Sequence, residues 1–267
     1  MTGTVLTTAD GERLTARWWR PRRLAGDDPS AAVVVVHGFC GGKDTPEVEM
    51  LALRLATDGR AVLTFDLRGH HTSTGRCSLG LHERHDVDAA VAAARDEAEL
   101  VVAVGSSLGA VATLDHLADA APADPRRADG AVLVAAPARW RMPLTSRGVM
   151  AVALTQTWPG RTILARRAAT RVEVRPVRPP QPVDRIRVVT RPVALLHGLD
   201  DRYVPPGAAR TLYAAAAEPR LLDLVPGMGH GLGPAAVAPV AAAVDWVGRA
   251  AAPEALADEG AAEGAGT

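Results

Sequence analysis

A serine between two glycines, at the point where an apolar run ends, is typical of a serine nucleophile. Ser107 is the third residue of GSSLG, which follows ELVVAV and precedes the helix-like AVATLDHLADA. A strand that turns sharply into a helix strains one residue, and flanking glycines let neighbouring chain pass close by. We therefore expect Ser107 at this corner. Ser106 would serve only if the turn shifted by one residue and broke the glycine spacing.

A histidine and an aspartate occur where such a serine needs them. A serine hydroxyl is a weak nucleophile until a base takes its proton and an acid fixes the tautomer of that base. His230 lies in PGMGHGLG and Asp201 in HGLDDRYVP, each just after a strand-like run. Functional groups gather at the carboxyl ends of strands in open α/β sheets, so the three residues can meet there. Asp200 remains an alternative for the acid.

Two backbone N–H groups are expected to stabilise the oxyanion that such a reaction forms. In proteins with a G-x-S-x-G nucleophile elbow, which GSSLG resembles, one belongs to the residue after the nucleophile, here Leu108, and the other to the loop after the third strand. That loop reads HGFCGG, and we expect the N–H of Phe39 to be the second donor. Cys40 remains an alternative, because backbone donors depend little on the side chain.

The elements that must position these residues form a repeated strand–helix pattern. AAVVVVHG, RAVLTFDLRG, ELVVAVGSS and GAVLVAAPA read as buried strands with helical segments between them, and the pattern resumes from RPVALLHG to the final helix PAAVAPVAAAVDWVGRAA. Continuous apolar strands that alternate with helices predict a parallel sheet covered on both faces. The N-terminal MTGTVLTTADGERLTARWW predicts two strands joined by a turn.

The stretch 139–191 interrupts this pattern. It holds 12 Arg against two acidic residues, which gives 12 − 2 = +10, and a Pro-rich segment that a central strand would not contain. We expect a cap or lid here, with 1–138 and 192–251 as the core and 252–267 as a flexible tail. The arginines either pair and face solvent or steer an anionic acyl substrate, carrier or lipid surface.

Composition excludes several classes of protein. The 267 residues are 48% hydrophobic and 22% charged, with 30 basic and 30 acidic residues, so neither disorder nor nucleic-acid binding is expected. No signal peptide or membrane-spanning run is evident, which predicts a soluble, cytoplasmic protein without stable membrane insertion. Cys40 and Cys77 are expected to be reduced thiols. Oligomeric state cannot be derived from these features.

Together the motifs resemble those of the α/β-hydrolase superfamily, in its capped esterase/lipase and serine-aminopeptidase-like branch. VVVVHGFCGG, FDLRGHHTSTG, VGSSLG, VALLHGLDDRYVP and GMGHG occur in the family's order over almost the whole chain. The resemblance implies an α/β-hydrolase fold: a mostly parallel sheet of about eight strands flanked by helices, with a small cap after strand 6. It implies no cofactor, and it places nucleophile, acid and base on Ser107, Asp201 and His230. Family members commonly carry glycine in place of His71, and often histidine or an aromatic residue in place of Ser106.

Other polar residues are expected to be structural. His37 and His197 precede strand-end glycines and are predicted to hydrogen-bond the backbone. Asp66 is predicted to anchor its loop through Arg68. His70, His71, His82 and His85 raise the question of a metal site, but none is expected, because HERH lacks the i, i+4 spacing of zinc proteases and no acidic cluster is evident beside it.

The predicted function is hydrolysis of an ester, or of a thioester or amide, through an acyl-enzyme on Ser107. An acyltransferase or cyclase could use the same intermediate, and a non-catalytic ligand-binding protein could share the fold. A group of large side chains is expected to pack inside the cap or else to line an acyl pocket: Trp140, Met142, Met150 and Trp158. The predicted substrate pocket consists of Cys40, Trp140, Met142 and Trp158.

Overall fold

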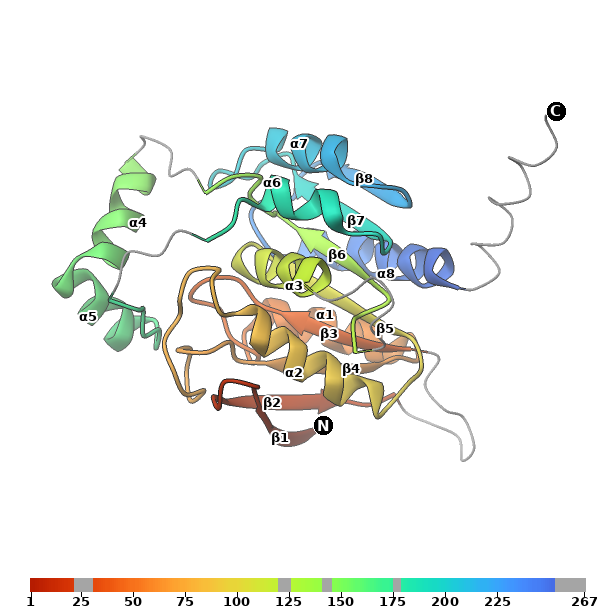
Figure 1. Ribbon diagram of the computed structural model, residues 1–267, viewed down its shortest axis with the longest axis horizontal. Helices are drawn as coiled ribbons and strands as arrows, with labels where there is room; N and C mark the ends of the chain where they lie inside the picture. Colours follow the sequence, from red (N-terminus) through yellow and green to blue (C-terminus); the bar gives the residue numbers. More distant parts are fainter. Residues whose placement is uncertain (22–30, 120–125, 141–145, 175–178, 253–267) are drawn as a thin grey trace.

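The protein is built on one mixed sheet, with antiparallel strands at one edge and parallel strands in the rest. The computed structural model describes residues 1–21, 31–119, 126–140, 146–174 and 179–252. Its eight-stranded sheet has the order β1-β2-β4-β3-β5-β6-β7-β8 (Figure 1). The strands are β1 (Thr2–Thr7), β2 (Arg13–Trp19), β3 (Ala32–Val36), β4 (Ala61–Phe65), β5 (Val101–Ser106), β6 (Gly130–Val134), β7 (Val193–Gly198) and β8 (Arg220–Val225).

The antiparallel edge of the sheet is more exposed than its parallel centre. β1 pairs antiparallel with β2, and β2 with β4, whereas all pairs from β4 to β8 are parallel. β3, β4, β5, β6 and β7 are buried throughout, which explains their continuous apolar sequences, while β1 is largely exposed. The predicted fold, a mostly parallel eight-stranded sheet flanked by helices, is confirmed.

Helices cover both faces of the sheet, and strand residues alternate between two cores. In β3, Val34 and Val36 belong to one core, with α2 and α3, while Val33 and Val35 belong to the other, with α1 and α8. None of the helices in the described ranges is long and apolar enough to cross a bilayer. The helices are α1 (Pro46–Thr57), α2 (Arg84–Arg95), α3 (Leu108–Asp119), α4 (Ser146–Gln156), α5 (Trp158–Arg167), α6 (Pro182–Arg185), η1 (Ile186–Val188), α7 (Gly207–Ala215), η2 (Pro234–Ala236) and α8 (Val237–Ala251).

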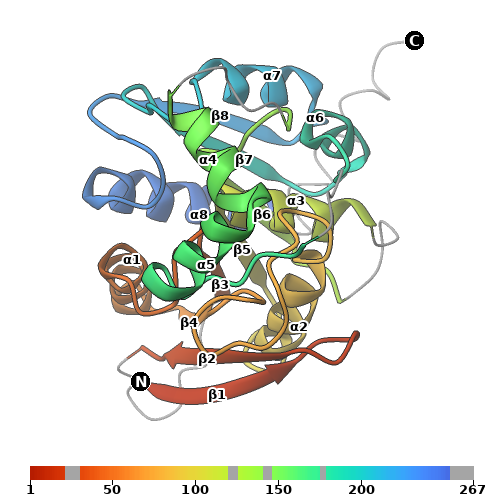
Figure 2. The same ribbon diagram turned by 90° about the vertical axis from the view of Figure 1, so that its left-hand side faces the viewer.

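The stretch predicted as a cap divides into two parts. Helices α4 and α5 form a hairpin that stands off from the sheet (Figures 1 and 2). In contrast, Val183 of α6 and Ile186 of η1 are buried in the core that contains α2 and α3. The extent of a cap stays a prediction. Met142 and residues 175–178, the first part of the Pro-rich segment, lie outside the described residues.

Candidate active site

Ser107 occupies the sharp corner between β5 and α3. Its φ is +52°, in the left-handed region that a non-glycine residue rarely adopts. A Cβ on Gly105 would come within 2.4 Å of the Gly109 carbonyl oxygen, and one on Gly109 within 2.4 Å of the Val36 carbonyl oxygen. The two glycines of GSSLG therefore allow the first turn of α3 to pass close to β5 and beneath the end of β3.

The structure brings Ser107, His230 and Asp201 together in one hydrogen-bonded chain. Nε2 of His230 lies 2.9 Å from the Ser107 Oγ, and its Nδ1 lies 2.7 Å from Oδ2 of Asp201. The side chain of Asp201 is fully buried, whereas that of His230 is 23% exposed. Nδ1 donates to the carboxylate, so Nε2 carries the lone pair and faces the serine hydroxyl.

The loop that follows β7 presents Asp201, and not Asp200, to the histidine. A Cβ on Gly198 would come within 2.1 Å of the Met228 carbonyl oxygen, so only glycine allows this loop to approach the histidine loop so closely. The backbone N–H of Asp200 donates to the same carbonyl over 3.0 Å, while its side chain is exposed.

Several N–H groups surround the Asp201 carboxylate. Its Oδ1 accepts the backbone N–H groups of Tyr203 (2.8 Å) and Val204 (2.9 Å). Burial alone would raise the pKa of Asp201, but the surrounding N–H groups, those of His197 and His230 first, hold that pKa well below its usual range. The carboxylate of Asp201 is therefore ionised at neutral pH.

His197 has a second role that was not expected from the sequence. Its Nε2 donates to the Val204 carbonyl oxygen over 2.9 Å, as predicted for a residue that binds backbone, and also lies 3.2 Å from Oδ2 of Asp201. The ring is fully buried, and its Nδ1 has no partner among the described residues. Through Nε2, His197 is therefore an N–H donor to the loop that carries Asp201. The i, i+4 spacing from Asp201 is the signal that could have indicated it.

The loop after β3 lies against the corner at Ser107. A Cβ on Gly38 would be 3.4 Å from the Ser107 Cβ, so Phe39 follows a point of direct contact. The backbone N–H of Cys40 donates to Nε2 of His70 over 3.3 Å, whereas that of Phe39 has no partner among the described residues. Leu108 begins α3, where a backbone N–H has no helical partner. The geometry thus favours Phe39 over Cys40 as the second oxyanion donor.

Two buried histidines hold this loop. The Nε2 of His37 accepts the Leu67 N–H over 3.0 Å, and its Nδ1 lies 2.7 Å from the Gly38 carbonyl oxygen. Nδ1 of His70 likewise lies 3.0 Å from the Arg68 carbonyl oxygen. Burial, reinforced by the neighbouring His70, lowers the pKa of His37 to about 3, and burial also lowers the pKa of His70. Both rings are therefore neutral and can accept the backbone N–H groups that fix the loop.

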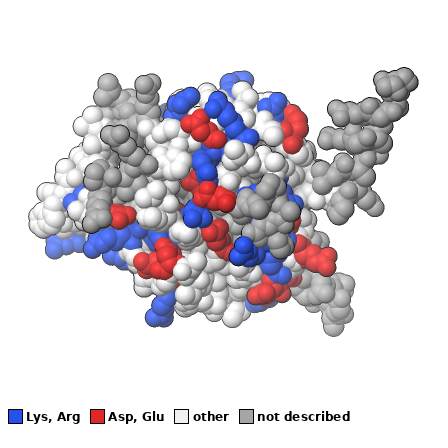
Figure 3. Space-filling view, viewed as in Figure 1, with Lys and Arg blue, Asp and Glu red and all other residues white. Residues whose placement is uncertain are grey.

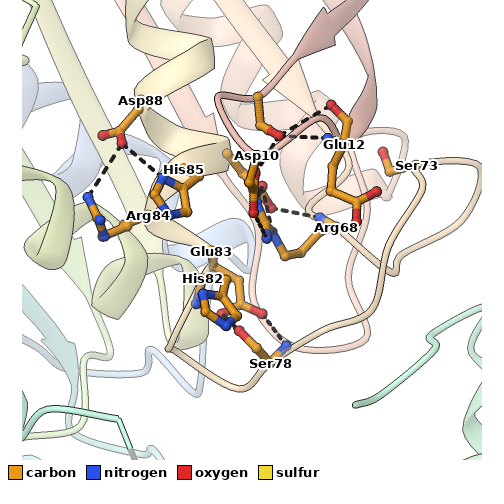
Figure 4. A network of polar contacts seen from close by, with 12 residues as sticks. Asp10, Glu12, Arg68, Ser73, Ser78, His82, Glu83, Arg84, His85 and Asp88 are labelled. Carbon is orange, nitrogen blue, oxygen red and sulfur yellow. Dashed lines mark hydrogen bonds and ion pairs between the residues drawn. The ribbon is translucent and has the colours of Figure 1, made fainter.

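The prediction that Asp66 anchors its loop through Arg68 is wrong. Arg68 instead binds Asp10 (2.7 Å) and Asp86 (2.8 Å), and Figure 4 shows its contact with Asp10. Two carboxylates already satisfy the guanidinium, so Asp66 binds elsewhere: it accepts the backbone N–H of Lys43 over 2.8 Å.

The four histidines that were considered as metal ligands lie in two separate places. His70 and His71 belong to the loop after β4 and contact the loop after β3, whereas the rings of His82 and His85 stack 6.4 Å apart near the start of α2 (Figure 4).

Comparison with known proteins identifies the family. A model of the alpha/beta hydrolase family matches residues 33–246. The chain belongs to this family. It is 30% identical over 229 residues, 85% of this chain and 71% of the other, to an uncharacterized protein of Mycobacterium tuberculosis, strain H37Rv. The predicted resemblance to the superfamily is confirmed.

Solved structures of similar fold include several esterases. The Pyrococcus furiosus esterase Pf2001 has a TM-score of 0.67 and 18% identity, over 94% of this chain and 88% of that one. The esterase RhEst1 from Rhodococcus sp. ECU1013 has a TM-score of 0.64 and 20% identity, over 92% of this chain and 98% of that one. At these identities the likeness shows the shared fold.

Two departures of this hydrolase from the family pattern have physical consequences. His71 has a φ of +44°, the left-handed conformation that favours glycine, and its Nε2 lies 3.1 Å from the Gly41 carbonyl oxygen. The ring of His71 thus contacts the loop after β3, which carries Phe39 and Cys40. Ser106 is buried, and a Cβ on Gly231 would be 3.4 Å from its Oγ, so it lies beside the histidine loop.

The residues predicted to line a substrate pocket of this hydrolase lie in different environments. Trp140 packs on Gly80, and its Nε1 donates to the Pro180 carbonyl oxygen over 3.0 Å. Trp158 is 74% exposed on α5, and Met142 lies outside the described residues. Cys40 is half-buried in the loop after β3, and burial raises the pKa of its thiol. A pocket formed by these residues stays a prediction.

Tyr203 is a neighbour of the base that sequence reasoning missed. Its ring centroid lies 5.3 Å from that of His230, and the side chain is 62% exposed. Tyr203 lies two residues after Asp201 in HGLDDRYVP, and this position is the signal that could have indicated it. An exposed ring beside the base can contact a bound substrate.

Proposed function

We propose that this hydrolase cleaves carboxylic esters through an acyl-enzyme on Ser107. The observation that carries the proposal is the continuous chain from the Ser107 Oγ through His230 to the buried Asp201, with separations of 2.9 and 2.7 Å. A hydroxyl, an imidazole in the accepting tautomer and an ionised carboxylate in this order are the groups that acyl transfer requires. The similarity in fold to proteins named as esterases supports the ester as substrate.

The proposed first half-reaction forms the acyl-enzyme. His230 Nε2 takes the hydroxyl proton as Ser107 Oγ attacks the carbonyl carbon, and the carbonyl electron pair moves to its oxygen. The backbone N–H groups of Phe39 and Leu108 stabilise that oxyanion. When the carbonyl re-forms, the bond to the alcohol breaks and His230 gives its proton to the leaving oxygen.

The second half-reaction releases the acid. Water attacks the acyl carbon while His230 takes one of its protons, and the proton then passes to Ser107 as the ester bond to the enzyme breaks. Asp201 remains ionised in both halves because of its low pKa, and it stabilises the imidazolium. Thioesters and amides would follow the same steps, with a sulfur or nitrogen leaving group.

The corner residue also separates this chemistry from other reactions of the superfamily. Dehalogenase and epoxide hydrolase chemistry in this superfamily uses an aspartate where the chain has Ser107. Acyl transfer or cyclisation would differ only in the nucleophile that intercepts the acyl-enzyme, and a ligand-binding protein would bind an ester without turnover.

The test is turnover of short p-nitrophenyl esters by the wild type and two matched variants. We expect Ser107→Ala to lose nearly all activity and Ser106→Ala, one residue away in the same turn, to keep most of it. Absence of turnover in the folded wild type would favour the binding protein. Full activity of Ser107→Ala would refute the proposed nucleophile, and product that contains an added alcohol acceptor would indicate acyl transfer.

A further inference from the structure

The α4–α5 hairpin exposes large apolar side chains. Trp158 is 74% exposed, and Val149 and Met150 are 63% and 59% exposed. Ile163 and Val152 follow at 52% and 42%. Apolar side chains gathered on one exposed element, in contrast to scattered single ones, indicate an interaction surface.

The packing of the hairpin explains why these side chains stay outside. A Cβ on Gly160 would come within 2.2 Å of the Ala153 carbonyl oxygen, so α4 and α5 approach as closely as a glycine permits. Leu164 is buried, whereas Val149, Val152 and Ala153 share the exposed side of α4 through their i, i+3, i+4 spacing. The two helices thus meet at Gly160, and Val149 and Val152 remain on the exposed side of α4.

The hairpin is also cationic. Residues 146–167, which form the hairpin, contain four arginines and no acidic residue, and Arg171 follows shortly after. Arg161 donates to the Thr155 carbonyl oxygen and Arg171 to that of His71, whereas Arg166 and Arg167 are exposed and have no ion pair among the described residues. In Figure 3 the left-hand edge of the molecule, where Figure 1 places α4 and α5, is white with Lys and Arg side chains below it.

Two kinds of partner could cover such a surface, and its chemistry favours one. A second copy in a symmetric contact would bring arginines against arginines, which is unfavourable. An aromatic and aliphatic surface with adjacent arginines suits the boundary of an anionic bilayer, where apolar side chains enter among the acyl chains and arginines bind headgroups. We propose that the α4–α5 hairpin docks the protein on an anionic lipid surface.

Docking would place the candidate active site near the lipid. The segment that leaves α5 forms bridges to the loop after β4, at His70↔Thr170 and Cys77↔Val172. The hairpin is therefore attached to a loop whose His70 accepts the backbone N–H of Cys40, next to Phe39. The proposal does not depend on catalysis, because the surface lies outside the Ser107–His230–Asp201 chain.

The test is co-sedimentation with phosphatidylcholine vesicles that contain or lack phosphatidylglycerol. We expect binding to the anionic vesicles alone, weakened by salt. An arginine near an anionic surface contributes about 5-fold in partitioning, so Arg166→Gln with Arg167→Gln is expected to weaken binding about 25-fold. Trp158→Ser with Ile163→Ser is expected to weaken it as well.

The controls separate this surface from general stickiness and from the proposed reaction. Leu53→Ser removes a 60% exposed leucine from α1 and is expected to leave binding unchanged. Ser107→Ala should bind like the wild type. Equal binding to neutral vesicles, no binding to anionic ones, or an equal loss in Leu53→Ser would overturn the proposal. So would a dimer in solution that Trp158→Ser with Ile163→Ser converts to monomer while vesicle binding persists.

Discussion

Replacement of Asp201 by asparagine should invert the tautomer of His230. Oδ1 of Asp201 accepts two backbone N–H groups, so the single oxygen of an asparagine must take that position. Its NH₂ group then faces Nδ1 of His230, which has to accept a proton instead of donating one. The imidazole proton moves to Nε2, which faces Ser107 and can no longer take its proton.

The expected loss follows from that inversion. A change to the wrong tautomer with intact geometry lowers kcat by about 10⁴-fold in a triad of this kind, which corresponds to about 5 kcal/mol in activation free energy. The assay is steady-state hydrolysis of a p-nitrophenyl ester, with the melting temperature as a check of folding. Asp200→Asn is the matched control, since its exposed side chain should be dispensable. A large loss in Asp200→Asn with little in Asp201→Asn would refute the assignment.

Three further predictions test the surroundings of the site. His197→Leu removes an N–H donor from the Asp201 carboxylate, so the pKa of Asp201, followed by NMR titration of its carboxyl carbon, should rise; His197→Gln should restore much of the wild-type value, and the same pKa in all three proteins would contradict this. Gly109→Ala places a Cβ within 2.4 Å of the Val36 carbonyl oxygen and should cost about 1–3 kcal/mol in a thermal melt, unlike Gly207→Ala, where a Cβ meets nothing within 4 Å; equal melting temperatures would contradict the close packing. If the arginines steer an anionic substrate, kcat/KM for an anionic ester should fall with salt, that for a neutral ester should stay nearly constant, and Arg139→Glu should flatten the anionic curve; the same salt response for both esters would refute steering.

Local sequence patterns were sufficient for the sheet and for the corner at Ser107. The continuous apolar strands β3 to β7 can be recognised because burial on both faces leaves little choice of residue. GSSLG could be interpreted because each glycine meets backbone at distances that exclude a side chain. These constraints act within or between adjacent elements, so a single sequence displays them.

Features that depend on distant contacts were harder to predict. Helices α4 and α5 have no clear apolar stripe, since apolar residues face outward as well as inward, and the segment was not assigned helices. The hydrogen-bond partner of Asp66 depends on which groups the fold brings close to its carboxylate. Lys43, which donates its backbone N–H to Asp66, lies 23 positions away in the sequence. Asp200 and Asp201 differ only in the backbone that surrounds them, which no spacing rule reveals.

The central claim is that Ser107 is the hydroxyl activated by His230. The most direct measurement is the site of covalent labelling by a fluorophosphonate, read from the mass of the modified peptide in the native protein and in His230→Ala. We predict one adduct, on Ser107, and nearly none in His230→Ala, because within the described part of the chain this is the hydroxyl that lies 2.9 Å from Nε2 of His230. An adduct on Ser106, or none in the folded wild type, would contradict the account.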